Sequence, residues 1–305
     1  MKVSVIIPSF NEEGNVFPMI EKLVPILEKY EDYEVIFVDD GSRDSTLQKL
    51  KEANSLNKKI NYLSFSRNFG HQNALRAGLD YCDGDCAISM DGDLQHPPEL
   101  IPELIEKWKE GYDIVYTLRG DGKKTSFFKK FTANLFYNMI NSMSNINIPK
   151  GAADFRLLDR SVVEVLKTFT ENTLFLRGLI SWLGFKQYGV KYSPCERFSG
   201  KTKYSIKKMT MFALTGITSF SVKPLHLSTI IGVILSIIAF FYGIYAILIK
   251  LFSNEALPGW TSVLVSVLFI GGVQLIMMGI MGEYVGKLFI ESKKRPNYIL
   301  KDKSL

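Results

Sequence analysis

Residues 86–95 read CAISMDGDLQ, an apolar run that ends in two aspartates separated by a glycine. The run from Cys86 to Asp91 is short and β-rich, which predicts a buried strand that ends at Asp91. Asp91, Asp93 and Gln95 then place two carboxylates and an amide at the strand end. Mg²⁺ and Mn²⁺ prefer such hard oxygen ligands and usually bridge them to phosphates. Taken alone, the same pattern also fits an ordinary solvated acidic turn.

The residues around this motif alternate between strand and helix patterns. Strands are expected at 3–8, 34–39, 60–66, 86–91 and 113–117, with helices at 13–30, 44–57 and 71–82 and from Pro97-Pro98 onward. This βαβα rhythm predicts an α/β domain built on a mostly parallel sheet covered by helices. Ligands of such sheets bind beyond the carboxyl ends of the strands. Polar groups follow all five strands, at 11–13, 39–42, 67–68, 91–93 and Arg119.

Two long stretches of the 305-residue chain, 224–249 and 258–282, contain no charged side chain. Each is long enough to cross a hydrocarbon core, which takes about 20 helical residues, so we expect two transmembrane helices in preference to a pair of buried core helices. Residues 186–223 carry eight basic side chains against one acidic, and 287–305 carry six against two. Basic flanks stay on the cytoplasmic side, which predicts a multi-pass protein of the cell membrane with both termini and the N-terminal domain in the cytoplasm.

The net charge of +6 has two physical interpretations. A basic balance can indicate nucleic acid binding, but here the charge lies beside the spans, where lipid phosphates are the better partners. Residues 205–220 form an amphipathic pattern expected to lie at the membrane interface. The aromatic stripe of residues 123–142 fits either a core helix or a helix resting on lipid. The three cysteines are too few for a disulfide framework, and residues 1–8 lack a secretory pattern.

Six motifs together carry a family resemblance. They are PSFNEE at 8–13, DDGSRDST at 39–46, DGDLQHPPE at 91–99, GAADFRLL at 151–158, RFSGKTKY at 197–204 and GEYVG at 282–286. With them the chain resembles the family 2 glycosyltransferases of the GT-A (Rossmann-like) fold over essentially its whole length. Within that family it is similar to the bactoprenol glucosyltransferases and the dolichol-phosphate mannose synthase group. Thr202 stands where the family often has serine, and it keeps the hydroxyl.

The resemblance implies a role for each motif. It implies nucleotide contacts for Pro8, Glu12, Asp39, Asp40 and Asp91, and a Mg²⁺ or Mn²⁺ site at Asp91, Asp93 and Gln95. It implies phosphate or acceptor contacts for Arg119, Arg197, Lys203 and Tyr204, and a place beside the reacting centre for Asp154. Two alternatives stay open: Asp154 as a structural acceptor beside Arg156, and Arg197 with Lys203 as ligands of lipid headgroups.

The implied reaction is an inverting transfer of a sugar from a nucleotide-sugar donor onto undecaprenyl or another polyprenyl phosphate. Glucose from UDP-glucose is the first choice of donor, and UDP-N-acetylglucosamine is the alternative. A phosphate monoester is largely ionised at neutral pH, with a second pKa of about 6, so this nucleophile needs little help from a base. Asp154 is therefore either a base or a group that orients the acceptor or the sugar.

Three other functions are disfavoured. A processive polysaccharide synthase would show a Gln-x-x-Arg-Trp motif, and none of the three tryptophans lies in one. A non-catalytic membrane scaffold would have no need of Asp91 and Asp93, which are both present. A lipid transporter would need more than two spans in one chain to form a path.

The expected organisation has four parts. Residues 1–200 form the cytoplasmic GT-A catalytic domain, 201–223 a juxtamembrane amphipathic helix, 224–290 a two-helix transmembrane hairpin, and 291–305 a basic cytoplasmic tail. Both spans carry small residues, including the pair Gly282 and Gly286. Small residues let helices approach closely in lipid, which predicts a homo-oligomer, with a tetramer suggested by the resemblance.

Overall fold

A computed structural model of the chain describes residues 1–120, 149, 151–171, 175–193, 218, 221–252 and 259–305. The predicted helix at 123–142 and the site residues Arg197, Lys203 and Tyr204 lie outside these residues. So does the predicted interfacial helix at 205–220, apart from Thr218.

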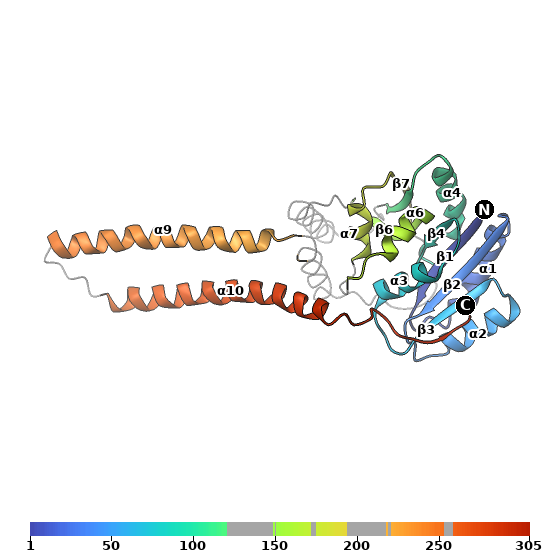
Figure 1. Cartoon of the computed structure of the whole chain (residues 1–305), viewed down its shortest axis with the longest axis horizontal. Coiled ribbons are helices and arrows are strands. Elements are labelled where there is room, and N and C mark those ends of the chain that lie inside the picture. The colour runs from blue at the N-terminus through green and yellow to red at the C-terminus, as the bar shows by residue number, and fades with distance from the viewer. Residues whose placement is uncertain (121–148, 150, 172–174, 194–217, 219–220, 253–258) are drawn as a thin grey trace.

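The sheet is built around four parallel strands, in the order β4, β1, β2, β3 (Figure 1). They are β1 (Lys2–Ser9), β2 (Asp32–Asp39), β3 (Ile60–Phe65) and β4 (Cys86–Ser89). Nearly every residue of these strands is buried, because helices cover both faces of the sheet. The register brings their carboxyl ends together, with Ser9 opposite Asp39 and Asp39 opposite Ser64.

The rest of the sheet is mixed. The remaining strands are β5 (Ile114–Arg119), β6 (Ala152–Asp159), β7 (Gln187–Tyr192) and β8 (Leu300–Lys303). β6 lies antiparallel between β4 and β5, β7 is parallel to β5, and β8 is antiparallel to β3. Among the described strands only β6 and β8 are reversed, so the prediction of a mostly parallel sheet is confirmed, with the insertion of β6 as an addition.

Helices pack on both faces of the sheet and create two hydrophobic cores. One face carries α1 (Val16–Leu27), α2 (Thr46–Leu56), η1 (Pro98–Leu100) and α4 (Ile101–Lys109). The other carries α3 (His71–Tyr81), α6 (Arg160–Lys167) and α7 (Leu176–Trp182). The helix predicted at 13–30 is shorter at both ends, and it starts later because residues 10–15 form a loop that belongs to the site.

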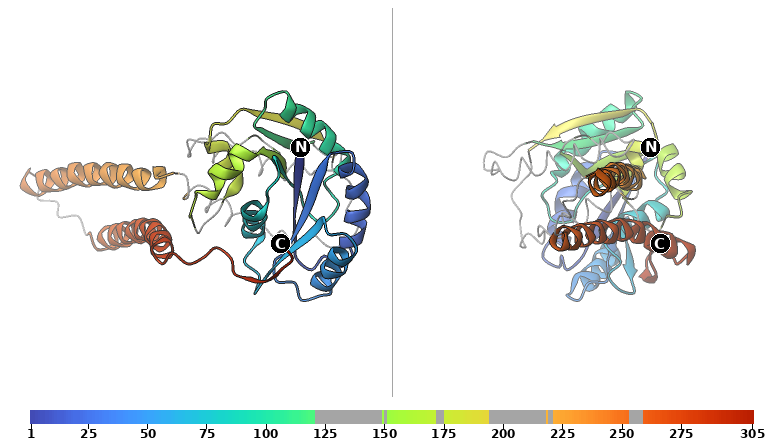
Figure 2. Two further views of the ribbon diagram at one scale, coloured as in Figure 1. Left: turned by 45° about the vertical axis from the view of Figure 1, so that its right-hand side comes forward. Right: turned by 90° about the vertical axis from the view of Figure 1, so that its left-hand side faces the viewer.

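Two long helices, α9 (Lys223–Phe252) and α10 (Trp260–Ser292), extend side by side away from this domain (Figure 1; Figure 2, left). Within Lys223–Ile249 and Val265–Ser292, the most apolar 18-residue windows have mean hydropathies of 2.5 and 2.0 and contain no buried residue. Core helices would be covered by the rest of the protein. The alternative of two buried core helices is therefore wrong, and both helices are candidates for spanning a membrane by length and composition.

The chain returns to the α/β domain after α10, and its last strand there is β8 (Figure 2, left). The segment expected as a basic tail thus contains an edge strand of the main sheet. Its residues alternate in exposure, with Leu300 and Asp302 half-buried and Lys301 and Lys303 exposed, as an edge strand requires. Both ends of the two-helix hairpin therefore lead back to one domain.

Candidate active site

The loops after β1 and β2 are interlocked at the carboxyl edge of the sheet. The backbone N of Asn11 donates to Ser42 Oγ (2.9 Å), and the backbone N of Arg43 donates to Asn11 Oδ1 (2.9 Å). Asn11 has a φ of +55°, a left-handed conformation that asparagine tolerates better than most residues. The backbone N of Glu12 donates to Thr46 Oγ1 (3.0 Å). These bonds bring the predicted nucleotide residues of the two loops next to each other.

Asp39 and Asp40 are both buried, and their carboxylates organise the surrounding backbone. Asp39 accepts from Ser42 N (3.0 Å) and from Ser64 Oγ (2.8 Å). Asp40 accepts from Phe69 N (2.6 Å) and from Gly70 N (3.0 Å). Burial raises the pKa of Asp40, and these two backbone bonds oppose the rise. A carboxylate has about four acceptor sites, so each aspartate can still accept a bond from a ligand hydroxyl.

Gly41 allows the loops after β2 and β3 to touch. Its φ is +69°, and a Cβ at this position would lie 2.5 Å from the carbonyl carbon of Arg67. Any side chain would push the two loops apart as well as strain the backbone. The loop that carries Asp40 is thereby held against the loop that carries Phe69 and Gly70.

The acidic turn after β4 is anchored by a buried histidine. Asp91 N donates to His96 Nδ1 (3.0 Å), so Nδ1 is unprotonated and a neutral ring carries its proton on Nε2. The His96 ring stacks on Phe155 with a centroid distance of 5.3 Å. Gln95 N donates to Asp93 Oδ1 (3.1 Å), which closes the turn. Gln95 is thus held in the turn by a hydrogen bond from its backbone N–H.

The acidic turn after β4 offers some of the ligands that a divalent cation needs. Asp91 Oδ1 is buried and accepts no hydrogen bond, although His71 Nε2 lies 3.4 Å away. A buried carboxylate oxygen without a donor is costly unless a cation satisfies it. The described residues contain no group of three or more His, Cys, Asp or Glu arranged to hold a metal. The two carboxylates suit Mg²⁺ or Mn²⁺ only if water and a ligand's phosphates supply the other positions, as is usual for Mg²⁺.

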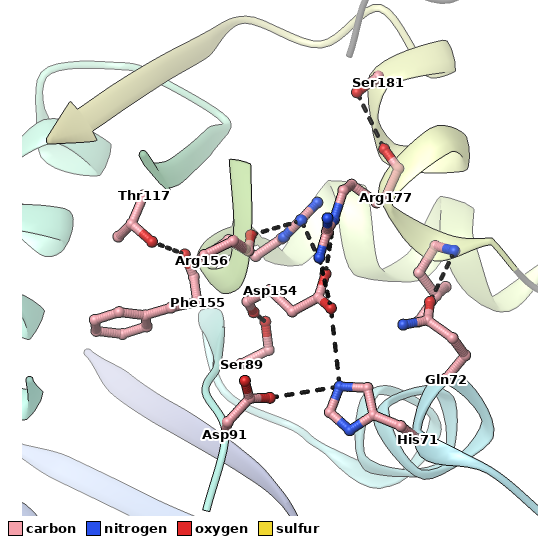
Figure 3. A network of polar contacts seen from close by, with 12 residues as sticks. His71, Gln72, Ser89, Asp91, Thr117, Asp154, Phe155, Arg156, Arg177 and Ser181 are labelled. Atoms are coloured by element: carbon pink, nitrogen blue, oxygen red, sulfur yellow. Dashed lines mark hydrogen bonds and ion pairs between the residues drawn. The ribbon is translucent and has the colours of Figure 1, made fainter. Parts of the chain in front are cut away.

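Asp154, on β6, is clamped by two arginines (Figure 3). Arg156 Nη2 lies 3.2 Å from its Oδ1, and Arg177 approaches with Nη2 3.0 Å from Oδ2 and Nε 3.2 Å from Oδ1. Burial raises the pKa of Asp154, but the charges of Arg177 and Arg156 outweigh it and hold that pKa well below its usual range. Burial lowers the pKa of Arg156 to about 10, so this side chain is still charged at neutral pH. The arrangement holds Asp154 as a fixed anion.

His71 lies between the two acidic groups of the site (Figure 3). It is the first residue of α3, and its Nε2 is 3.4 Å from Asp91 Oδ1 and 3.8 Å from Asp154 Oδ2. The imidazole therefore connects the acidic turn after β4 with the arginine-clamped carboxylate on β6. His71 follows the loop after the third strand, where site residues were expected, but no sequence motif marks it.

Arg177 is the second site residue that the sequence analysis missed. It comes from α7, so no strand-end pattern marks it, and its approach to Asp154 depends on tertiary packing. One element of that packing is visible: Leu176 N donates to Gln72 Oε1 (3.1 Å) on α3.

Arg119 lies at the end of β5, beside the end of β7. Gly120 N donates to Tyr192 O (2.8 Å), which joins the two strand ends. Burial raises the pKa of Tyr192, the charge of Arg119 lowers it, and the charges of Asp91 and Asp93 raise it. The ring of Tyr192 also packs edge-on against His96, with centroids 5.9 Å apart, so the exposed Arg119 beside it lies at the rim of the same site.

Comparison with known proteins gives full-length relatives. The chain is 44% identical over 303 residues to the prophage bactoprenol glucosyl transferase homolog of Escherichia coli, with 99% of each chain covered. It is 43% identical over 304 residues to the bactoprenol glucosyl transferase of Shigella phage SfV, again with 99% of each covered. Among solved structures it is similar to glucosyl-3-phosphoglycerate synthase from Mycobacterium tuberculosis, with 18% identity, a TM-score of 0.47, and 71% and 78% coverage.

Residues 4–167 match the family model described as glycosyl transferase family 2. These residues contain the interlocked loops, the acidic turn and Asp154, and they make up more than half of the chain. With the mixed α/β sheet of the GT-A type, this match confirms the expected family and fold class: the chain belongs to glycosyl transferase family 2.

Proposed function

We propose that the protein transfers glucose from UDP-glucose onto a polyprenyl phosphate at the cytoplasmic face of the membrane. The observation that carries the proposal is the convergence of Asp91, in the acidic turn after β4, with the arginine-clamped Asp154 on either side of His71, on a chain that also has two exposed apolar helices. The relatives named bactoprenol glucosyl transferase support the lipid acceptor and the hexose. UDP-N-acetylglucosamine is the alternative donor for the same reaction.

The donor is assigned to the interlocked loops. Pro8, Glu12, Asp39 and Asp40 would surround the nucleoside, where buried carboxylates can accept from ribose hydroxyls or a base edge. Asp91, Asp93 and Gln95 would hold Mg²⁺ or Mn²⁺ against the donor diphosphate. When bound, the cation would neutralise charge on the departing diphosphate.

In this proposal Asp154 holds other groups in position and does not serve as the base. A carboxylate whose pKa is held far below neutrality is a poor proton acceptor, and an ionised phosphate nucleophile has little need of one. The acceptor's phosphate oxygen attacks the anomeric carbon, the bond to the diphosphate breaks, and the configuration inverts. Asp154 keeps Arg177 and Arg156 aligned beside that centre, and Arg119 faces the phosphates from the rim. Positioned cations suit a reaction that brings two anions together.

The acceptor's phosphate is also assigned to Arg197, Lys203 and Tyr204, on the sequence motif alone.

The membrane topology of the hairpin is proposed from the position of strand β8. The pairing of β8 with β3 in the α/β domain supports a hairpin that begins and ends on the same side of the membrane. The basic flanks favour the cytoplasm as that side, with two proposed crossings in between.

The test uses the purified full-length protein in lipid, with undecaprenyl phosphate and radiolabelled UDP-glucose or UDP-N-acetylglucosamine. We expect a lipid-linked glucose product that forms in Mg²⁺ or Mn²⁺ and disappears in excess chelator. A product from UDP-N-acetylglucosamine alone would replace the donor and leave the reaction class intact. Absence of lipid-linked sugar with either donor, from protein shown to be folded, would contradict the proposal.

A further inference from the structure

Residues 297–304, here called the C-terminal strap, cover the free edge of β3. Ser66 N donates to Ile299 O (2.9 Å), and β8 continues the pairing antiparallel to β3. At the far end, Ser304 N donates to Tyr62 O (3.0 Å) and Tyr62 N donates to Ser304 Oγ (2.8 Å). The strap thus makes hydrogen bonds with backbone N–H and C=O groups that would be unpaired on an uncovered edge strand.

Tyr298 fixes the strap to the domain through its side chain. Its ring stacks on Phe65, with centroids 5.1 Å apart and an interplanar angle of 16°. Its hydroxyl donates to Asp80 Oδ2 (2.9 Å), whose other oxygen accepts from Arg76 Nε (2.8 Å). Stacked aromatic pairs contribute beyond the area they bury, so the ring of Tyr298 stabilises the strap on β3.

A series of direct contacts leads from Tyr298 to Asp39 and Asp40, at the end of β2. Phe65, which is 1% exposed, packs edge-to-face on Phe69 with centroids 5.6 Å apart. Phe69 N donates to the carboxylate of Asp40. Beside Phe65 on the same strand, Ser64 Oγ donates to Asp39. Both buried aspartates are therefore oriented by residues 64–70, the segment whose outer edge the strap covers.

The strap also connects the membrane helices to this side of the domain. Only residues 293–296 separate the end of α10 from the strap, a distance of less than about 20 Å even when extended. A shift of α10 relative to the domain would therefore pull directly on Tyr298 and the β3 edge.

We propose that the C-terminal strap is part of the donor site: Tyr298, acting through Phe65 and Phe69, positions the loop that orients Asp40 toward the donor nucleoside. The inference rests on the proposed function, because that is where Asp39 and Asp40 are assigned to the donor. Tyr298 touches no reacting group in this proposal, so it is a positioning residue, and its loss weakens donor binding before it affects acceptor binding.

The test compares three variants of the full-length protein in detergent. Tyr298→Ala removes the stack, Tyr298→Phe keeps the ring and loses the bond to Asp80, and Lys301→Ala changes an exposed side chain of the same strand. We expect Tyr298→Ala to raise the Kd for UDP in Mg²⁺ and the KM for the sugar donor about three- to tenfold. The KM for polyprenyl phosphate and kcat should be nearly unchanged, and the other two variants should resemble the parent.

Hydrogen exchange of the amides of residues 66–70 gives a second readout that is independent of activity and of the donor's identity. Exchange there should be faster in Tyr298→Ala than in Lys301→Ala. Parent-like UDP affinity together with parent-like exchange in Tyr298→Ala would overturn the proposal, as would equal losses for donor and acceptor. If the parent itself does not bind UDP, the proposed donor is wrong, and the exchange measurement still decides on the strap. If Tyr298→Ala does not fold, Tyr298→Leu carries the same test.

Discussion

Arg177 Nη2 lies 3.0 Å from Asp154 Oδ2, which joins α7 to β6 across the middle of the site. Arg156 completes the clamp from the strand itself. The pair leaves Asp154 ionised, and both guanidinium groups bond to its carboxylate, while Arg156 Nη2 also donates to Ala153 O (2.8 Å). Asp154 therefore helps to keep both arginines in place.

Asp154→Asn should lower both activity and stability. The amide keeps the shape and loses the charge, so Arg156 would remain buried opposite a neutral group. Removing one partner of a buried ion pair costs on the order of 3 kcal/mol, and we expect a loss of that size in the free energy of unfolding. Thermal or denaturant unfolding of the purified variant measures it. A variant that is inactive but as stable as the parent would contradict the clamp.

The stability provided by Asp154 should not change across the ordinary pH range. Its pKa is lowered in the folded protein, so the contribution is present above the unfolded-state pKa of about 3.9 and is lost only as pH falls through the folded value. The difference in unfolding free energy between parent and Asp154→Asn should therefore be equal at about pH 5 and about pH 8. A difference that shrinks at the lower pH would mean that Asp154 takes up a proton there.

Asp93→Asn should separate chemistry from folding. The amide oxygen can still accept from Gln95 N, so we expect the melting temperature to stay close to that of the parent. Loss of a carboxylate ligand for a divalent cation should reduce the transfer rate at least about a hundredfold. The rate is measured with labelled donor, and Mn²⁺ binding by electron paramagnetic resonance. Full activity in the variant, or unchanged Mn²⁺ affinity, would remove Asp93 from the metal site.

Gly41→Ala should cost more than the same change at Gly111. Both glycines have a positive φ, so each alanine carries backbone strain of about 1 kcal/mol. A Cβ at Gly111 would meet no atom within 4 Å, whereas at Gly41 it would collide with backbone atoms of Arg67 and Asn68. We expect Gly41→Ala to destabilise the protein further and to weaken UDP binding, while Gly111→Ala affects stability only. Equal effects of the two variants on both measurements would mean that the loop contact is unimportant.

The strand-end motifs could be predicted because they are local in sequence. The turns at 39–42 and 91–95 each follow an apolar run, and parallel strands bring such turns together without further information. The position of Arg177 could not be predicted in this way, because it depends on how α7 packs against α3. The same holds for β6, which returns between β4 and β5, and for β8, a four-residue edge strand rich in charge.

The two spans have a small-residue surface that the hairpin itself does not use. A Cβ at Gly271, Gly272, Gly279, Gly282 or Gly286 would meet nothing within 4 Å beyond its own helix. The explanation of these glycines as packing within one hairpin is therefore not supported by the described residues. We propose that they form the contact between copies of the chain, in a homo-oligomer that we expect to be a tetramer. In lipid, close approach and van der Waals packing drive such association, because the hydrophobic effect does not.

Replacing Gly279 and Gly282 together by leucine should weaken this oligomer, because the added side chains keep the helix backbones apart. Val285→Leu, a change between exposed apolar side chains on the same helix, is the matched control and should leave the assembly unchanged. Mass measurement in a mild detergent that preserves activity gives the distribution of species for parent, control and variant. A parent that is monomeric under these conditions would rule out the oligomer. A double-leucine variant that assembles like the control would place the contact elsewhere on the chain.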